Sequence, residues 1–166
     1  MKILVLNAGS SSLKSSLYEC SKNKQKALAH SLIDGIGSEN CKFTFKSSKK
    51  NIGQKKKIKS HKAALKLALE LLTSHSSIQD LKEIDAIANR VVHGGEKYSE
   101  PVKIGKRVIE EIEKLSNLAP LHNPVNLDVI KAAKEVLPRT PQIAIFDTAF
   151  HQSMPEEAFL YALPYS

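Results

Sequence analysis

The amino-terminal stretch constrains the fold of this chain most. Residues 2–6 are a short apolar run that opens with a lysine, and a second strand-like run covers residues 13–18. Between them lies the small, hydroxyl-rich segment Asn7-Ala8-Gly9-Ser10-Ser11-Ser12. Two apolar runs joined by a few turn-forming residues predict a β-hairpin. The chain is therefore expected to begin with an antiparallel pair of strands whose tip carries several hydroxyl groups.

The tip of this hairpin suits a phosphate group. Gly9 permits a close approach of the backbone, and Ser10 and Ser12 offer hydroxyl donors. Lys14 supplies a mobile positive charge, and Asn7 adds a neutral oxygen that suits a hydrated magnesium ion. No Walker motif occurs in the sequence, so any phosphate binding would be of a hairpin type. The alternative interpretation is a serine-rich turn without a ligand, because short motifs produce false matches.

Composition excludes several classes of protein. Of the 166 residues, 42% are hydrophobic and 25% are charged, which is typical of a globular protein. No apolar run approaches the roughly 18 residues of a membrane span, and the first apolar run is too short for a secretory signal. Cys20 and Cys41 have neither metal-ligand spacing nor the density of a disulfide scaffold. We therefore expect a cytoplasmic chain with reduced thiols and no membrane partner.

The net charge of +8 is concentrated in one block: ten lysines and no acidic residue lie between Cys41 and Lys66. Such a block is compatible with nucleic-acid binding. However, it contains no arginine, and its aromatic residues, Phe43 and Phe45, alternate with polar residues as on the buried face of a strand. Gly53 marks an expected turn between two edge strands, which lysines protect from unwanted pairing. The pattern favours a solvated hairpin, with no specific nucleic-acid partner.

The rest of the chain predicts an antiparallel meander followed by alternating helices and strands. Further strands are expected at residues 27–33, 42–45, 84–92 and 142–146. Helical periodicity covers residues 64–72, 108–115 and 125–136. Ser60 is the expected N-cap of the first helix, and Asn123 and Pro124 are the expected cap and first residue of the third. This order of elements predicts an α/β fold with a mixed sheet.

Polar residues follow or close three of these strands. Asn7, Arg90 and Asp147 each lie at or near a strand end, and His122 precedes a helix. Because ligand sites form at the carboxyl ends of strands in such sheets, we expect these four residues at one edge if the strands are neighbours. Each also has a purely structural alternative: a surface ion pair for Arg90, a cap or core role for His122, and a turn cap for Asp147.

Four segments together resemble the acetate kinase family: NAGSSSLK (7–14), RVVHGG (90–95), LAPLHNP (118–124) and FDTAFHQSMP (146–155). The resemblance covers the whole chain and implies the ribonuclease H-like fold shared by actin, Hsp70 and sugar kinases. In that fold a lobe has a mixed, mostly five-stranded sheet with flanking helices, and ATP lies between two lobes. Family members are more than twice as long. The resemblance therefore implies an amino-terminal lobe over residues 1–150 and the truncated start of a second lobe over residues 151–166.

The resemblance also implies an activity, which is reversible transfer of the ATP γ-phosphate to acetate with Mg²⁺, giving acetyl phosphate and ADP. The roles it implies are a metal site at Asn7, ATP or phosphate contacts from Ser10, Ser12 and Lys14, acetate contacts from Arg90, Val92 and Leu121, and catalytic roles for Arg90, His122 and Asp147. A second histidine, a second arginine, the adenosine-binding loops and a magnesium-site glutamate would lie beyond residue 166.

Two classes of function remain open. The first is an acetate kinase present as its amino-terminal half, whose partners are acetate, ATP and either a separately encoded second lobe or another copy of itself. The second is a non-catalytic remnant or interaction module that retains one lobe of the fold. Under the first, the isolated chain is expected to have little or no activity, because phosphoryl transfer needs charge stabilisation from both sides of a cleft.

Overall fold

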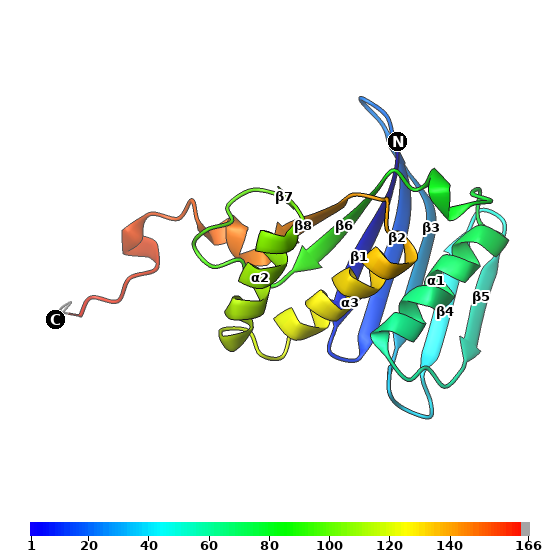
Figure 1. Ribbon diagram of the computed structural model, residues 1–166, viewed down its shortest axis with the longest axis horizontal. Coiled ribbons are helices and arrows are strands. Elements are labelled where there is room, and N and C mark those ends of the chain that lie inside the picture. The colour runs from blue at the N-terminus through cyan, green and yellow to red at the C-terminus, as the bar shows by residue number, and fades with distance from the viewer. Residues whose placement is uncertain (164–166) are drawn as a thin grey trace.

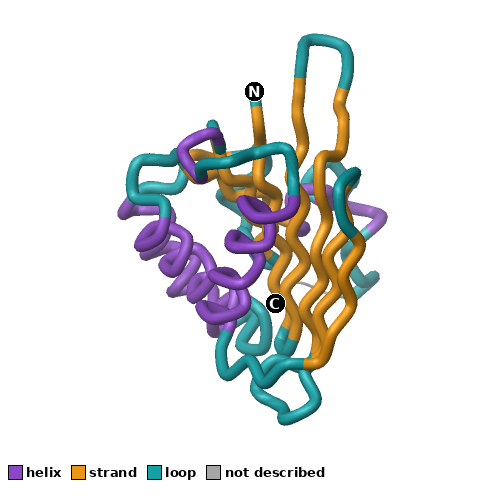
Figure 2. The backbone as a smooth tube through the Cα atoms, turned by 90° about the vertical axis from the view of Figure 1, so that its right-hand side faces the viewer, coloured by secondary structure: helices purple, strands orange, loops and turns teal. Residues whose placement is uncertain are grey.

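The computed structural model of this protein describes residues 1–163. Its strands form one twisted sheet, and the α-helices described lie on one face of that sheet (Figure 1; Figure 2). The strands are β1 (Lys2–Gly9), β2 (Ser12–Cys20), β3 (Gln25–Asp34), β4 (Lys42–Ser47), β5 (Asn51–Lys55), β6 (Ala86–Val91), β7 (Val102–Lys103) and β8 (Gln142–Phe146). The α-helices are α1 (His61–His75), α2 (Lys106–Lys114) and α3 (Asn123–Val136).

The sheet is mixed, with eight strands in the order β5-β4-β3-β2-β1-β6-β8-β7. Strands β1 to β5 form the expected antiparallel meander, whereas β6 and β8 run parallel to β1. The α/β class is thus confirmed. The expected five-stranded sheet corresponds to the central β3-β2-β1-β6-β8, and the sheet is wider than expected because the lysine-rich hairpin pairs with β3 and the short β7 pairs with β8.

The core lies between the sheet and helices α1 and α3. Ser60 caps α1 as expected, since its side chain accepts a hydrogen bond from the Ala63 N–H. The buried face of α1 consists of Ala64, Leu65, Ala68, Leu69, Leu71 and Leu72. These side chains pack with apolar residues of β1 to β4 in one continuous cluster. A smaller cluster under α2 and the first half of α3 includes Val108, Ile112, Leu127 and Phe146.

The lysine-rich segment forms the hairpin β4–β5, but its predicted turn is wrong. The turn covers residues 48–50, and Gly53 lies inside β5, opposite Thr44. The hydroxyl of Ser47 accepts hydrogen bonds from the Lys49 and Lys50 N–H groups, so this serine satisfies the turn without glycine. The buried positions of Phe43 and Phe45 confirm the predicted strand face. That this hairpin binds no nucleic acid specifically stays a prediction.

The predicted capping role of Asn123 is also wrong. His122 occupies the N-cap position of α3 without a side-chain capping bond, and Asn123 is the first helical residue and fully buried. Pro124, expected as the first helical residue, is the second and still lies within the first turn. Asn123 is buried because it bonds to the backbone beyond β6, a long-range contact that local patterns do not reveal.

After β8 the chain continues as two short 3₁₀ turns, Asp147–His151 and Glu156–Ala158, and extends away from the sheet (Figure 1). The last three residues of the expected second segment, 164–166, lie outside the described residues. Among residues 1–163, no helix combines the length and apolar character needed to cross a bilayer.

Candidate active site

Arg90 joins the ends of three strands. Its Nε donates to Asp147 Oδ1 at 3.0 Å, and its Nη2 donates to Asp147 Oδ2 at 2.5 Å. Its Nη1 donates to Asn7 Oδ1 at 3.1 Å. The paired bonds to the carboxylate are bidentate, which fixes the plane of the guanidinium group. The side chains of Arg90 and Asp147 are each 41% exposed, so this group of residues is open to solvent.

The strand register explains why these residues meet. In the parallel pair β1–β6, Leu6 lies beside Asn89, and in the parallel pair β6–β8, Arg90 lies beside Ile145. The next residue of β1, Asn7, is therefore level with Arg90, and Asp147 follows one residue after the end of β8. Three strands that run in the same direction thus end at the same edge, where ligand sites form in α/β sheets.

The alternation along the strands directs these side chains to the face without helices. Asn7 is half-buried between the buried Leu6 and Ala8, which face the helices. Arg90 alternates in the same way with buried neighbours. Lys14 is exposed and pairs directly with Asn7 across β1–β2, so its side chain emerges on the same face. Two cations and one amide therefore share this surface.

The hairpin between β1 and β2 is tightly held. Gly9 pairs with Ser12, and a Cβ at position 9 would lie 2.8 Å from the Ser12 hydroxyl, so a side chain does not fit there without a shift. The ring of His61, at the start of α1, forms a hydrogen bond of 2.8 Å with the Gly9 carbonyl. The Ile36 N–H donates to the Ser11 carbonyl at 2.8 Å. These bonds fix the hairpin and leave Ser10 exposed at its tip.

Two buried asparagines of α3 tie the helix to the strand ends. Asn126 accepts from the Val92 N–H at 3.2 Å and donates to the Ala8 carbonyl at 3.0 Å. Asn123 accepts from the His93 N–H at 3.1 Å and donates to the His93 carbonyl at 3.0 Å. The amino terminus of α3 is therefore anchored to both β1 and β6 beside the arginine.

The loop after β6 is shaped by a close glycine contact. A Cβ at Gly94 would lie 2.6 Å from Cγ of Phe146, so only glycine fits at this position without displacing that ring. Phe146 in turn stacks on Tyr98 with ring centroids 4.8 Å apart. The Gly94 N–H donates to the Thr148 hydroxyl at 2.9 Å. These contacts join the loop to the segment that carries Asp147.

His122, Leu121 and Val92 lie at the same edge but do not contact the arginine group through any hydrogen bond among residues 1–163. His122 and Leu121 are exposed, the latter by 73%, and Val92 is half-buried. The bonds of Asn123 place His122 close to the end of β6. The structure thus joins Asn7, Arg90 and Asp147 by direct hydrogen bonds. Val92, Leu121 and His122 lie around this group without bonding to it.

The oxygen atoms present fit a magnesium ion that keeps several waters. Asn7 supplies a neutral amide oxygen and Asp147 a carboxylate, which are ligand types that Mg²⁺ accepts together with water and phosphate oxygens. Among residues 1–163, no three His, Cys, Asp or Glu side chains converge to hold a metal by themselves. The donor set therefore suits a metal that arrives with a phosphate, and not a closed protein cage.

Several positioning residues are not predicted from the sequence to contribute to the site, although Asn123 is expected to cap α3. They are His61, Asn123, Asn126 and Thr148, and each forms a hydrogen bond to the backbone of the hairpin or of the loop after β6. Asn123 and Asn126 are three residues apart and share a helix face with apolar residues, which is the one signal in the sequence that indicates buried polar contacts. His61 and Thr148 offer no comparable signal.

Comparison with known proteins identifies similar sequences along the whole chain. The family model described as the acetokinase family matches residues 2–166. The chain is 49% identical over 164 residues to a protein named acetate kinase from Geobacillus sp. (strain WCH70), and equally identical to one from Bacillus subtilis (strain 168). Each alignment covers 99% of this chain and 41% of the relative. The chain therefore spans well under half the length of these relatives.

Solved structures show the same fold. The crystal structure of Porphyromonas gingivalis acetate kinase matches with a TM-score of 0.90 at 40% identity, covering 99% of this chain and 41% of that one. A propionate kinase from Francisella tularensis matches with a TM-score of 0.86 at 38% identity over the same shares of both chains. The expected actin-like fold class is thereby confirmed.

Proposed function

The chain belongs to the acetokinase family, and from this premise we propose that it forms the acetate- and phosphate-binding side of an acetate kinase. The reaction is transfer of the ATP γ-phosphate to acetate, giving acetyl phosphate and ADP, and it is reversible. The observation that carries the proposal is the arginine held by Asp147 and Asn7 at the carboxyl ends of three parallel strands. The proposal is also supported by the relatives that match 99% of this chain, which are named acetate kinase.

The chemistry of the acceptor favours such a site. Acetate has a pKa close to that of a glutamate side chain, about 4.3, so it is ionised at neutral pH and needs no base to attack phosphorus. The difficulty is electrostatic, because an anion must approach a polyanionic phosphate. Catalysis then depends on positioning and on neutralising charge. Arg90 binds the carboxylate and the transferring phosphoryl group, and Val92 and Leu121 contact the acetate methyl group.

The remaining proposed roles concern ATP. Ser10, Ser12 and Lys14 contact its phosphates at the hairpin, and His122 donates to the transferring phosphoryl group. Asn7 and Asp147 would hold Mg²⁺ through their side-chain oxygen atoms or through bound water, and Asp147 also orients Arg90. When bound, the metal ion neutralises phosphate charge. The curated relatives are named acetate kinase, which favours acetate as the acceptor, whereas one similar solved structure is that of a propionate kinase.

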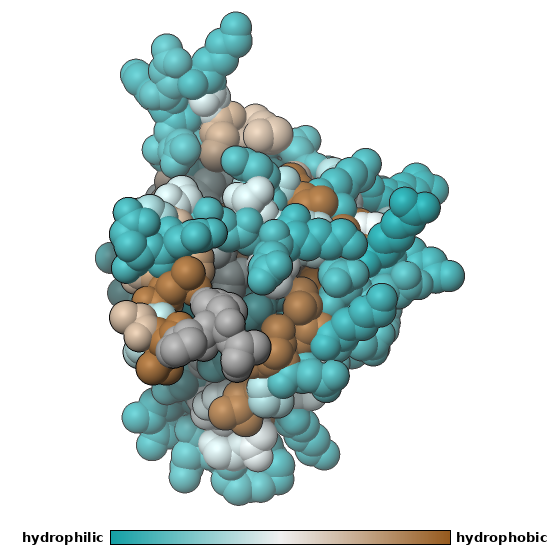
Figure 3. Space-filling view, turned by 90° about the vertical axis from the view of Figure 1, so that its left-hand side faces the viewer, coloured by the Kyte–Doolittle hydropathy of each residue, from teal (hydrophilic) through white to brown (hydrophobic). Residues whose placement is uncertain are grey.

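We propose residues 1–150 as one lobe and residues 151–166 as the start of a second. Apolar side chains of the tail support this division, since they lack cover within residues 1–163. The exposed ones are Met154, Phe159, Leu160, Tyr161 and Leu163, and Phe150 at the end of the first lobe is exposed as well. Figure 3 shows apolar residues gathered on the end of the molecule from which this tail leaves. Such surfaces bind other protein segments, so a second lobe or another copy of the chain is the proposed partner. A cytoplasmic location stays a prediction.

The test is acetyl phosphate formation from ATP and acetate. We expect the chain of 166 residues alone to be nearly inactive, because loss of one transition-state arginine in phosphoryl transfer costs roughly three to five powers of ten in rate. Mixing it with a separately made carboxyl-terminal part of the Bacillus subtilis relative should restore turnover. Arg90→Ala should abolish the restored activity, and the exposed Arg107→Ala on α2 is the matched control that should not.

Two outcomes decide against parts of this proposal. Turnover by the chain alone at the rate of a full-length relative contradicts the division into halves. Stable assembly of the two parts without any turnover supports the second candidate function, a non-catalytic interaction module, which the exposed apolar tail favours.

A further inference from the structure

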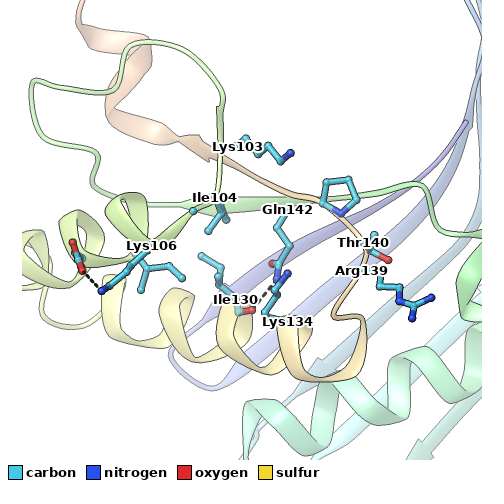
Figure 4. A pocket seen from close by; sticks show the side chains of 12 residues that line it. Lys103, Ile104, Lys106, Ile130, Lys134, Arg139, Thr140 and Gln142 are labelled. Carbon is cyan, nitrogen blue, oxygen red and sulfur yellow. Dashed lines mark hydrogen bonds and ion pairs between the residues drawn. The ribbon is translucent and has the colours of Figure 1, made fainter.

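A separate cavity lies at the other end of the strands from the candidate active site. It is lined by the β7–α2 junction, by the second half of α3 and by the segment that leads into β8 (Figure 4). Gln142, the first residue of β8, lines it, whereas Asp147 follows the last residue of the same strand. Its volume of about 620 Å³ falls within the roughly 300–1,000 Å³ of small-molecule sites.

The floor of the cavity is apolar and fixed. Ile104 and Ile109 are half-buried, and Ile130 of α3 is buried. Gln142 donates through Nε2 to the Ile130 carbonyl at 3.0 Å (Figure 4). Its Oε1 accepts from Asn89 Nδ2 at 3.0 Å. Both ends of the Gln142 amide are therefore bonded. Its side chain forms a fixed wall of the cavity opposite the isoleucine side chains, and it does not need to rearrange when a ligand binds.

The rim of the cavity carries an excess of positive charge. The charged residues that line it are four cations, Lys103, Lys106, Lys134 and Arg139, and one carboxylate, Glu110. Glu110 pairs with Lys106 at 3.9 Å, and among residues 1–163 no carboxylate lies within 4.0 Å of the charged groups of Lys103, Lys134 or Arg139. The rim therefore attracts anions, with little internal neutralisation.

Two further features point to an anion. Gly105, which lines the cavity, is the N-cap of α2 and provides no side-chain bond to the first turn, which also lacks acidic residues. The unpaired N–H groups and the helix dipole at this end favour negative charge. Thr140 is only 9% exposed and lines the cavity, and its hydroxyl has no hydrogen bond within the described part of the chain.

We propose that this cavity binds a small organic anion with an apolar body, such as a medium-chain carboxylate. The carboxylate contacts the cations of the rim and the first turn of α2, and the alkyl chain covers the three isoleucines. The site is separate from the proposed phosphoryl-transfer site and does not depend on it, because it is formed by other residues, at the opposite end of β8.

The experiment is titration of the 166-residue chain, labelled at its isoleucine methyl groups, with octanoate and observed by nuclear magnetic resonance. We expect saturable shifts of the Ile104, Ile109 and Ile130 methyl signals, with a dissociation constant of about 1 mM or below. Octanol, which lacks the charge, and acetate, which lacks the apolar body, should each bind at least about tenfold more weakly.

Charge-reversal variants provide the matched test. The double variant Lys103→Glu/Arg139→Glu should weaken octanoate binding at least about tenfold. The control Lys49→Glu/Lys66→Glu changes the net charge equally at exposed positions away from the cavity and should leave binding unchanged. The methyl spectrum itself reports whether each variant is folded.

Three results would overturn the proposal. The first is a shift of the Ile3 and Ile145 methyl signals, on the face of the sheet without helices, in place of the cavity signals. The second is equal weakening by the two double variants, and the third is equal binding of octanol. None of these results bears on acetyl phosphate formation, so the two proposals fail independently.

Discussion

Arg90 keeps donors available although it is already bonded to two neighbours. An arginine side chain has five N–H donors, and three of them bind Asp147 and Asn7. The two that remain are on an exposed side chain whose plane is fixed by the bidentate pair. An incoming carboxylate or phosphoryl group therefore meets donors that are already oriented, which reduces the entropic cost of binding.

A single added methyl group at Gly94 should reduce the stability of the folded chain. Gly94→Ala places a Cβ within 3.0 Å of Phe146 Cβ, Cγ and Cδ1, atoms of a buried side chain that also stacks on Tyr98. We expect a loss of about 1–3 kcal/mol in the free energy of unfolding, as for other overpacked sites. Urea denaturation followed by circular dichroism measures it.

The matched control is Gly53→Ala in β5. Its Cβ would lie 3.9 Å from the nearest side-chain atom, Thr44 Cγ2, and no other contact is close. Alanine should therefore be neutral or slightly stabilising there. Equal midpoints for the two variants would show that the loop after β6 adapts freely, contrary to the geometry described above.

Among the elements, α1 links the core to the β1–β2 hairpin. Its buried face packs on the meander, and its first residue, His61, bonds to the Gly9 carbonyl. The cap at Ser60 therefore fixes both the start of the helix and the position of that histidine. The hairpin tip is held from the helix side of the sheet, while its lysine emerges on the other side.

Removal of the Ser60 cap should destabilise the start of α1. Ser60→Ala deletes the hydroxyl that accepts from the Ala63 N–H, and such substitutions cost roughly 0.5–2 kcal/mol. We expect the loss in thermal or urea unfolding, together with faster hydrogen exchange in the first turn of α1. Ser74→Ala, at an exposed position in the last turn of the same helix, is the control and should not destabilise, because alanine has the higher helix propensity. Similar losses for both would argue against a capping role.

For the whole molecule, one ion pair joins distant parts of the chain at the amino end of the sheet. Lys2 of β1 donates to Glu83 at 2.5 Å, and Glu83 also accepts from the Gln79 and Asp80 N–H groups. The hydrogen bond from Lys2, followed by those backbone N–H groups, lowers the pKa of Glu83 to about 2. The same bond raises the pKa of Lys2.

The Lys2–Glu83 pair should make the free energy of unfolding depend on pH in the acid range. Because the pKa of Glu83 is lower in the folded chain, its ionised form stabilises folding above the unfolded pKa of about 4.3. That stabilisation should be lost as the pH falls toward 2. Glu83→Gln should therefore be less stable than the unmodified chain at pH 7, with the difference shrinking between about pH 4.3 and the folded pKa. Urea titrations at several pH values measure it.

Glu100→Gln, an exposed loop substitution, controls for the change in net charge and should show no such pH dependence. If the difference in free energy of unfolding between Glu83→Gln and the unmodified chain stayed constant from pH 7 to pH 2, the ionisation assigned to Glu83 would be contradicted.

Local patterns in the sequence are sufficient to predict most of the elements and the residues near strand ends. Apolar alternation and helical periodicity predict most strands and all three α-helices, because these patterns follow from which side of an element is buried. The hairpin at residues 7–14, Arg90 near the end of one buried run and Asp147 just after another follow in the same way. The family resemblance added the expected roles, because four motifs occur in the family's order.

How these elements meet follows from long-range packing and not from local patterns. The parallel register of β1, β6 and β8 brings Asn7, Arg90 and Asp147 into contact, and no local pattern specifies which strands become neighbours. The burial of Asn123 and the turn at Ser47 differ from the predictions because hydrogen bonds to distant or adjacent backbone groups replaced the expected cap and glycine. Long-range pairing depends on the whole set of packed surfaces, and a residue pattern read along the chain records only one surface at a time.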